Sequence, residues 1–94
     1  PSTGLIAYFL GRQMLVIRAP LVPRQKLHGE QAFVEIYRGA GKSADNVLEL
    51  EMHGPHETLA PGVATSFEQT FELLDYEGPE TQEGHLARLR ELGQ

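Results

Sequence analysis

The stretch that most constrains the fold of this chain is Val47 to His53, in which apolar and polar side chains alternate strictly. The two sets are Leu48, Leu50 and Met52 on one side, and Val47, Glu49, Glu51 and His53 on the other. Successive side chains of a strand point to opposite faces, so the pattern predicts a strand with one apolar face and one polar face. Gly54-Pro55 ends the strand, and Pro61-Gly62 fits the two central positions of a type II turn.

Similar alternating patterns predict four more strands. Near the end of the chain the apolar residues instead recur every third residue, which is typical of a helix. Gly78-Pro79 fits a helix start, and a stripe of Leu86, Leu89 and Leu92 with Gly93 behind it fits a short amphipathic helix and its cap. We expect strands at about 5–10, 13–19, 32–38, 46–53 and 63–74, and a helix at about 80–92. The predicted fold is an all-β antiparallel sandwich of about five strands with one C-terminal helix, in a single domain at 1–94.

The first two predicted strands form a hairpin with two apolar faces. Gly11-Arg12 separates them, and Gly at the first central position favours a two-residue type II′ turn. One face would carry Ile6, Tyr8, Leu15 and Ile17, and the other Ala7, Phe9, Met14 and Val16. A sheet with one wet face would alternate, so both faces are expected to be covered. We expect residues 5–19 to contact either another copy of the chain or an N-terminal half of a larger protein.

Composition excludes several classes of function. The 94 residues include no cysteine, which rules out a disulfide framework, a thiolate zinc site and a cysteine nucleophile. No apolar run approaches the roughly 18 residues of a membrane span. The net charge of −5 includes ten acidic groups and no Lys or Arg at positions 43–86, which argues against nucleic-acid binding. Gly39 to Ser43 resembles the end of a phosphate-binding loop, but Ile36 replaces the required Gly and a strand follows, so a hairpin loop is predicted.

Polar residues on and after the strand at 46–53 are the candidates for chemistry. Glu49 and Glu51 share one face, and Glu35 on the preceding strand is a candidate cross-strand neighbour. Closely spaced carboxylates are typical of general acid–base sites, although a solvated outer face of a sheet has the same pattern. His53 and His56 with Glu51 and Glu57 offer donor atoms for a metal, but solvent-exposed loop histidines are the favoured interpretation of this pattern. No metal or other cofactor is expected.

Several segments together are similar to a known family. They are Ile6-Ala7-Tyr8, Leu15-Val16-Ile17-Arg18, Val34-Glu35-Ile36-Tyr37, and above all the run from Leu48 to Gly62, LELEMHGPHETLAPG. Over residues 4–76 the chain resembles the C-terminal part of an uncharacterised bacterial branch of the galactose mutarotase-like (aldose 1-epimerase-like) proteins. The resemblance implies part of a large antiparallel β-sandwich that binds sugars on a concave sheet, with an earlier region of that fold absent from this chain.

The resemblance also implies roles for individual residues. In such proteins a glutamate on a late strand acts as a base on the anomeric hydroxyl, and Glu49 or Glu51 matches it by position. The expected substrate-binding residues are Glu35, His53, His56 and Arg18. Epimerase-like chemistry is expected only in a fuller protein, so the expected function of this chain is carbohydrate binding. The alternative is a non-enzymatic domain for dimerisation or protein interaction through residues 5–19.

Overall fold

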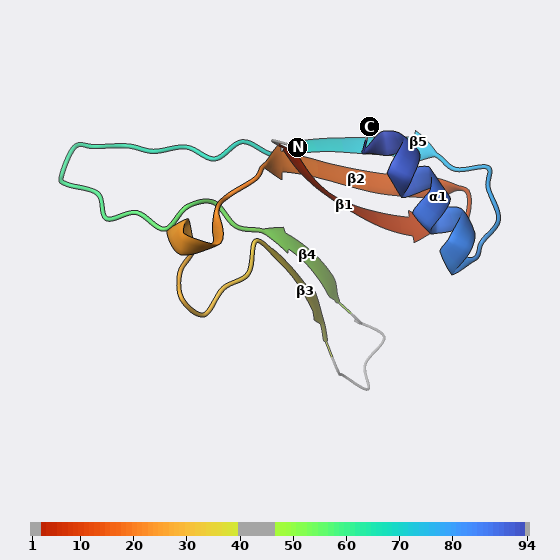
Figure 1. Cartoon of the computed structure of the whole chain (residues 1–94), viewed down its shortest axis with the longest axis horizontal. Helices are drawn as coiled ribbons and strands as arrows, with labels where there is room; N and C mark the ends of the chain where they lie inside the picture. Colours follow the sequence, from red (N-terminus) through yellow and green to blue (C-terminus); the bar gives the residue numbers. More distant parts are fainter. Residues whose placement is uncertain (1–2, 40–46, 94) are drawn as a thin grey trace. The chain divides into compact units, whose positions relative to one another are not determined.

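The structure is a computed structural model that describes residues 3–39 and 47–93. In order, the described elements are β1 (Thr3–Leu10), β2 (Gln13–Pro20), the 3-10 turn η1 (Arg24–Lys26), β3 (Val34–Arg38), β4 (Leu48–Met52), β5 (Thr70–Asp75) and α1 (Gln82–Leu92) (Figure 1). The strands form two antiparallel sheets, one ordered β1-β2-β5 and the other β3-β4. The expected all-β fold with a C-terminal helix is confirmed.

The chain divides into two compact units, each described separately below. The helix-bearing unit combines residues 3–19 with residues 69–93, and the hairpin unit comprises the described residues between 20 and 68. The single domain expected at 1–94 stays a prediction.

The helix-bearing unit contains the three-stranded sheet with β2 at its centre. Gly11 has a φ of 59° in the two-residue turn between β1 and β2, and no described residue other than glycine has a positive φ. This combination fits the type II′ turn and excludes type I′, which needs a positive φ at both central positions. On the other side of β2, strand β5 pairs in register from Gln13 with Asp75 to Arg18 with Thr70.

Helix α1 contributes to the core of this unit. Met14, Val16 and Tyr76 are the buried centre of the cluster, and Phe9 and Leu92 are among the partly buried residues packed against it. The helix begins after Thr81, whose side chain accepts a hydrogen bond from the backbone N–H of Gly84. The helix thus covers one of the two apolar faces that the hairpin was expected to have, and its packing supplies stability that an isolated 11-residue helix would lack.

Two details of the expected helix are wrong. It begins at Gln82 rather than at 80, because Thr81 provides the cap. Leu86 does not belong to the covered stripe and is exposed, whereas His85 stacks on Phe9 with ring centroids 3.9 Å apart. The spacing of the three leucines gave no indication that the imidazole of His85 is the side chain that covers Phe9.

The second face of the three-stranded sheet is apolar as well. Register places Leu73 opposite Leu15 and Phe71 opposite Ile17. Ile17 is buried, while Phe71 and Leu73 are 61% and 66% exposed. The expectation that a partner or a further half of the protein covers this face stays a prediction.

The hairpin unit contains β3 and β4 and two long loops. Register pairs Val34 with Met52, Glu35 with Glu51, Ile36 with Leu50, Tyr37 with Glu49, and Arg38 with Leu48. Of the side chains expected on the core face of β4, Met52 is buried, Leu50 is half-buried and Leu48 is exposed. The connection between the strands includes residues 40–46, so the predicted loop over Gly39 to Ser43 lies largely outside the described residues.

The last predicted strand, at 63–74, is wrong over its first half. The type II turn forms as expected, with Gly62 at a φ of 84° and the Val63 N–H donating to the Ala60 carbonyl at 3.0 Å. Residues 63–69 then form no strand, and β5 begins only at Thr70. Phe67, the main apolar residue of this segment, instead packs on the backbone of Gly54. The alternation of apolar and polar residues in this segment therefore reflects packing within a loop rather than strand pairing.

Candidate functional site

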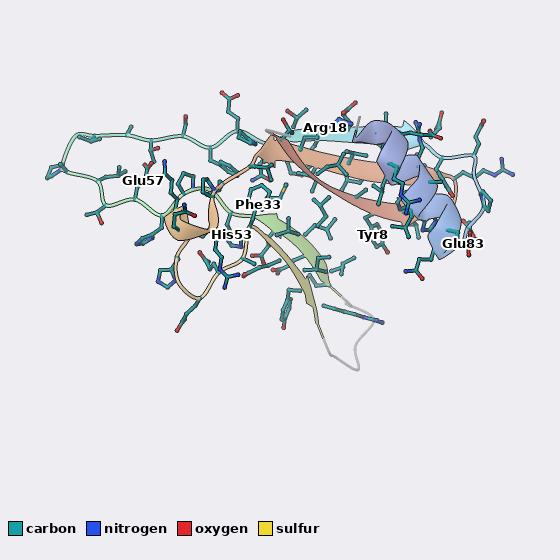
Figure 2. The ribbon with its side chains drawn as sticks, in the orientation of Figure 1. Tyr8, Arg18, Phe33, His53, Glu57 and Glu83 are labelled. Carbon is teal, nitrogen blue, oxygen red and sulfur yellow. The ribbon has the colours of Figure 1, made fainter. Side chains whose placement is uncertain are left out.

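The candidate site lies on the polar face of the β3-β4 sheet, at the end where β4 stops. Glu35 and Glu51 are directly opposite each other in the antiparallel register, as the sequence suggested. His53 directly follows the last residue of β4 (Figure 2). Its backbone N–H donates to the Phe33 carbonyl at 2.9 Å, which extends the β3-β4 pairing by one residue pair. Since side chains two apart share a face, this pairing brings His53 to the two glutamates.

The three side chains converge at close range. His53 Nε2 lies 3.3 Å from Glu51 Oε2 and 3.6 Å from Glu35 Oε1. The side chain of His53 is 19% exposed, and those of Glu51 and Glu35 are 39% and 36% exposed. The two carboxylates are therefore open to a ligand from one side, while the imidazole is largely covered.

The His53 Nε2 atom is buried and makes no hydrogen bond to any described residue. Its distances to the carboxylates are within reach of an ion pair, but the alignment is not that of a hydrogen bond. A buried imidazole nitrogen without a partner is costly, and native structures rarely retain one without a reason. The described residues therefore provide no hydrogen-bond partner for this nitrogen.

A hollow of about 500 Å³ continues along the same face from the cluster. It is lined by Glu35, Ile36, Tyr37, Glu49 and Glu51. Tyr37 is opposite Glu49 in the register and is exposed, so its ring is available on this face. Tyr37 was not among the residues expected at the site, although the alternation of Phe33, Glu35 and Tyr37 in the sequence places it on their face.

The loop after β4 is held in place by two contacts within the hairpin unit. A Cβ at Gly54 would lie 2.9 Å from the Phe67 ring, so Gly is needed directly after His53. The backbone N–H of His56 donates to the Lys26 carbonyl at 2.7 Å, which ties this loop to η1. The backbone on the C-terminal side of His53 is thus fixed by packing and by a hydrogen bond.

Not all the expected site residues come together. His56 stacks edge-on with His28, with ring centroids 5.2 Å apart, and the group of possible metal ligands found among the described residues is Glu35, Glu51 and His53. Arg18 lies on β2 in the helix-bearing unit (Figure 2). There it pairs with Glu72 at 3.3 Å. Glu57 is exposed in the loop. The partnership of His28 with His56 had no signal in the sequence, because it depends on how two loops meet.

Fold and site together define a small all-β protein that carries a carboxylate–histidine cluster on a two-stranded sheet. In the residues that the structure describes, no helix is both long and apolar enough to cross a membrane. The chain belongs to the family DUF4380, a domain of unknown function, whose model matches residues 1–74. The matched region contains the whole cluster and ends within β5, before α1. Searches of curated proteins and of solved structures found no significant match.

Proposed function

We propose that this chain binds a carbohydrate on the β3-β4 face that carries Glu35, Glu49, Glu51 and His53. The observation that carries the proposal is the convergence of Glu35, Glu51 and His53 at one end of an open hollow. Sugar hydroxyls are hydrogen-bond donors, and a bond from a neutral donor to an ionised carboxylate is stronger than one between neutral groups. Two half-exposed carboxylates can accept several such bonds from a single sugar ring.

Tyr37 supports the same proposal. A pyranose presents a row of C–H groups on one face and hydroxyls around its rim, so an exposed aromatic ring next to carboxylates matches both kinds of surface. Tyr37 lies on the same face as Glu35 and is opposite Glu49. A ligand in the hollow would meet an apolar platform and charged acceptors at the same time, which is how small sites combine affinity with orientation.

The chemistry proposed for a fuller protein is proton transfer at the anomeric centre. That reaction needs a base for the anomeric hydroxyl and an acid for the ring oxygen. Of the two glutamates matched by position, Glu51 is favoured, since it lies 3.3 Å from His53 whereas Glu49 is opposite Tyr37. Arg18 and His56 stay proposed contacts from the resemblance, with no support from the geometry of this cluster.

Calorimetric titration with a panel of common aldoses tests the proposal. We expect saturable binding that weakens about tenfold or more in Glu51→Gln and in Glu35→Gln, as loss of a charge-assisted hydrogen bond would require. Glu30→Gln is the matched control, because Glu30 is an exposed glutamate of the same unit that lies outside the cluster. Equal affinity in the wild type and both cluster variants would contradict the proposal.

A second candidate function is self-association through the part of the second apolar face of the β1-β2-β5 sheet that is exposed at β5. Phe71 and Leu73 are exposed side by side with Tyr8 also exposed on the hairpin. Strand β5 is at an edge of this sheet, so its free backbone groups can pair with the same edge of a second copy. Two identical apolar edges satisfy the self-complementarity that a two-fold dimer requires.

Sedimentation at several protein concentrations tests this second candidate. A concentration-dependent dimer that is lost in Leu73→Glu is expected, with exposed Glu77→Gln as a control that should leave the dimer intact. A strict monomer at all concentrations would contradict it.

A further inference from the structure

We infer that Glu35, Glu51 and His53 form a binding site for a divalent transition-metal ion, with Zn²⁺ as the preferred metal. The site uses three of the residues proposed for carbohydrate binding, but the inference does not require that a sugar binds there. It differs from the metal candidate considered from the sequence, since His56 and Glu57 are not members of the cluster and Glu35 is.

The spacing of the donor atoms fits a metal. One oxygen of each glutamate and one nitrogen of His53 lie within 4.8 Å of one another. In a tetrahedral zinc site with bonds of about 2.0–2.1 Å, ligand atoms are roughly 3.3 Å apart. The separations of His53 Nε2 from Glu51 and Glu35, 3.3 Å and 3.6 Å, are close to that value.

The state of the His53 ring provides the second, independent observation. Its Nε2 atom is buried and makes no hydrogen bond to the residues that the structure describes, although two carboxylates are near it. An imidazolium placed to neutralise the glutamates would be expected to donate a well-aligned hydrogen bond to one of them. A metal between the three side chains would give this nitrogen a partner and offset the repulsion of two carboxylates in direct cross-strand opposition.

The donor set selects among metals. Imidazole ligation favours Zn²⁺ and neighbouring transition metals, whereas Mg²⁺ and Ca²⁺ prefer sites built only of oxygen. Three protein ligands are fewer than the four of a closed structural site, so one position would remain for water or for a hydroxyl of a bound molecule. The two ligands on β3 and β4 are held opposite each other by strand pairing, and His53 is held by the Phe33 hydrogen bond on one side and the Gly54–Phe67 packing on the other.

Calorimetric titration of the whole chain with ZnCl₂, MgCl₂ and CaCl₂, without sugar, tests the inference. One zinc per chain is expected, with Mg²⁺ and Ca²⁺ bound at least about a hundredfold more weakly. His53→Gln and Glu35→Gln should each weaken zinc binding by about a hundredfold or more, since each removes a direct ligand. His28→Gln is the matched control and should leave zinc affinity unchanged, because His28 neighbours His56 and not the cluster.

The outcomes separate this inference from the alternatives. Failure of the wild type to bind zinc, or loss of binding in His28→Gln with retention in His53→Gln, would overturn it. If His53→Gln loses the dispersed amide spectrum of a folded protein, the zinc affinity of Glu35→Gln tests the inference instead. X-ray absorption of the zinc-loaded wild type provides a second test. A single imidazole with oxygen ligands is expected there, and two imidazoles would overturn the site. Sugar titration in the presence of EDTA then tests the carbohydrate proposal separately.

Discussion

The two sheets of this protein use similar strand patterns for different purposes. The helix-bearing unit contains six of the seven buried apolar residues found among those the structure describes, and the hairpin unit contains only Met52. The β1-β2-β5 sheet packs Met14, Val16 and Tyr76 into a core, with Leu92 of α1 against it. The β3-β4 sheet instead presents two glutamates and a histidine on one face. Most of the buried apolar side chains are therefore in the helix-bearing unit. The carboxylate–histidine cluster is in the hairpin unit, where few apolar side chains are buried.

The largest effect is expected from truncating the core of the helix-bearing unit. Met14 is 1% exposed at the centre of that cluster, so Met14→Ala leaves a cavity that the neighbouring side chains cannot fill. Chemical denaturation should show a loss of about 2–5 kcal/mol in the free energy of unfolding. A loss below about 1 kcal/mol would show that this sheet is not the main source of stability.

A smaller but more specific effect is expected at Gly84. Alanine is the better helix former by about 1 kcal/mol, so propensity alone predicts that Gly84→Ala stabilises the helix. A Cβ there would lie 2.5 Å from the Pro79 carbonyl oxygen and 2.7 Å from the Tyr76 hydroxyl, which donates a hydrogen bond to that same carbonyl. We expect a net loss of about 1–3 kcal/mol by thermal unfolding. Exposed Gln82→Ala is the control, and a gain in stability for Gly84→Ala would contradict the account.

In the hairpin unit, Gly54 is also too close to a neighbouring side chain to accept a Cβ, but its substitution is expected to affect zinc binding more than stability. Gly54→Ala would force the Phe67 ring to move, since the new Cβ would lie 2.9 Å from it. We expect a loss of only about 1 kcal/mol in stability but a clear fall in zinc affinity, because His53 precedes Gly54. Gly29→Ala in the same unit is the control, because no atom of the described residues lies within 4 Å of a Cβ added there. Unchanged zinc affinity in Gly54→Ala would show that this packing does not position His53.

The smallest effect is expected from the ion pair on the three-stranded sheet. Arg18 and Glu72 are 3.3 Å apart, with side chains 27% and 41% exposed. Such exposed pairs contribute at most about 1 kcal/mol, and salt screens them. Arg18→Gln should therefore lower the unfolding midpoint slightly at low ionic strength and less at high ionic strength. A large loss that is independent of salt would mean that Arg18 has another structural role.

Local patterns predicted the elements whose partners are near in the sequence. The Gly11-Arg12 hairpin, the Pro61-Gly62 turn, and the cross-strand position of Glu35 and Glu51 are all confirmed. Each of these depends on a few neighbouring residues or on the period of two along paired strands. Those signals also identified the polar face that carries the cluster.

The features that were missed depend on contacts between segments distant in the chain. The residues next to Phe67 in the sequence do not indicate that its ring contacts Gly54. The alternating pattern of the segment at 63–69 therefore suggested a strand that does not form. The cover that His85 provides over Phe9 likewise arises only when α1 packs on β1. In the site, the sequence indicated the carboxylates and His53 but grouped them with His56. That grouping relied on the short sequence separation of the two histidines, because the path of the loop between them and its neighbours could not be predicted.

The most direct test of the account is an amide-resolved NMR titration of the whole chain with common aldoses. It distinguishes the two sheets within one experiment and reports on folding at the same time. We expect saturable shifts at 35–37 and 49–53, with the amide signals of the β1-β2-β5 core unchanged. A well-dispersed spectrum that shows no shifts, or shifts confined to the helix-bearing unit, would contradict the claim that the β3-β4 face is the binding surface.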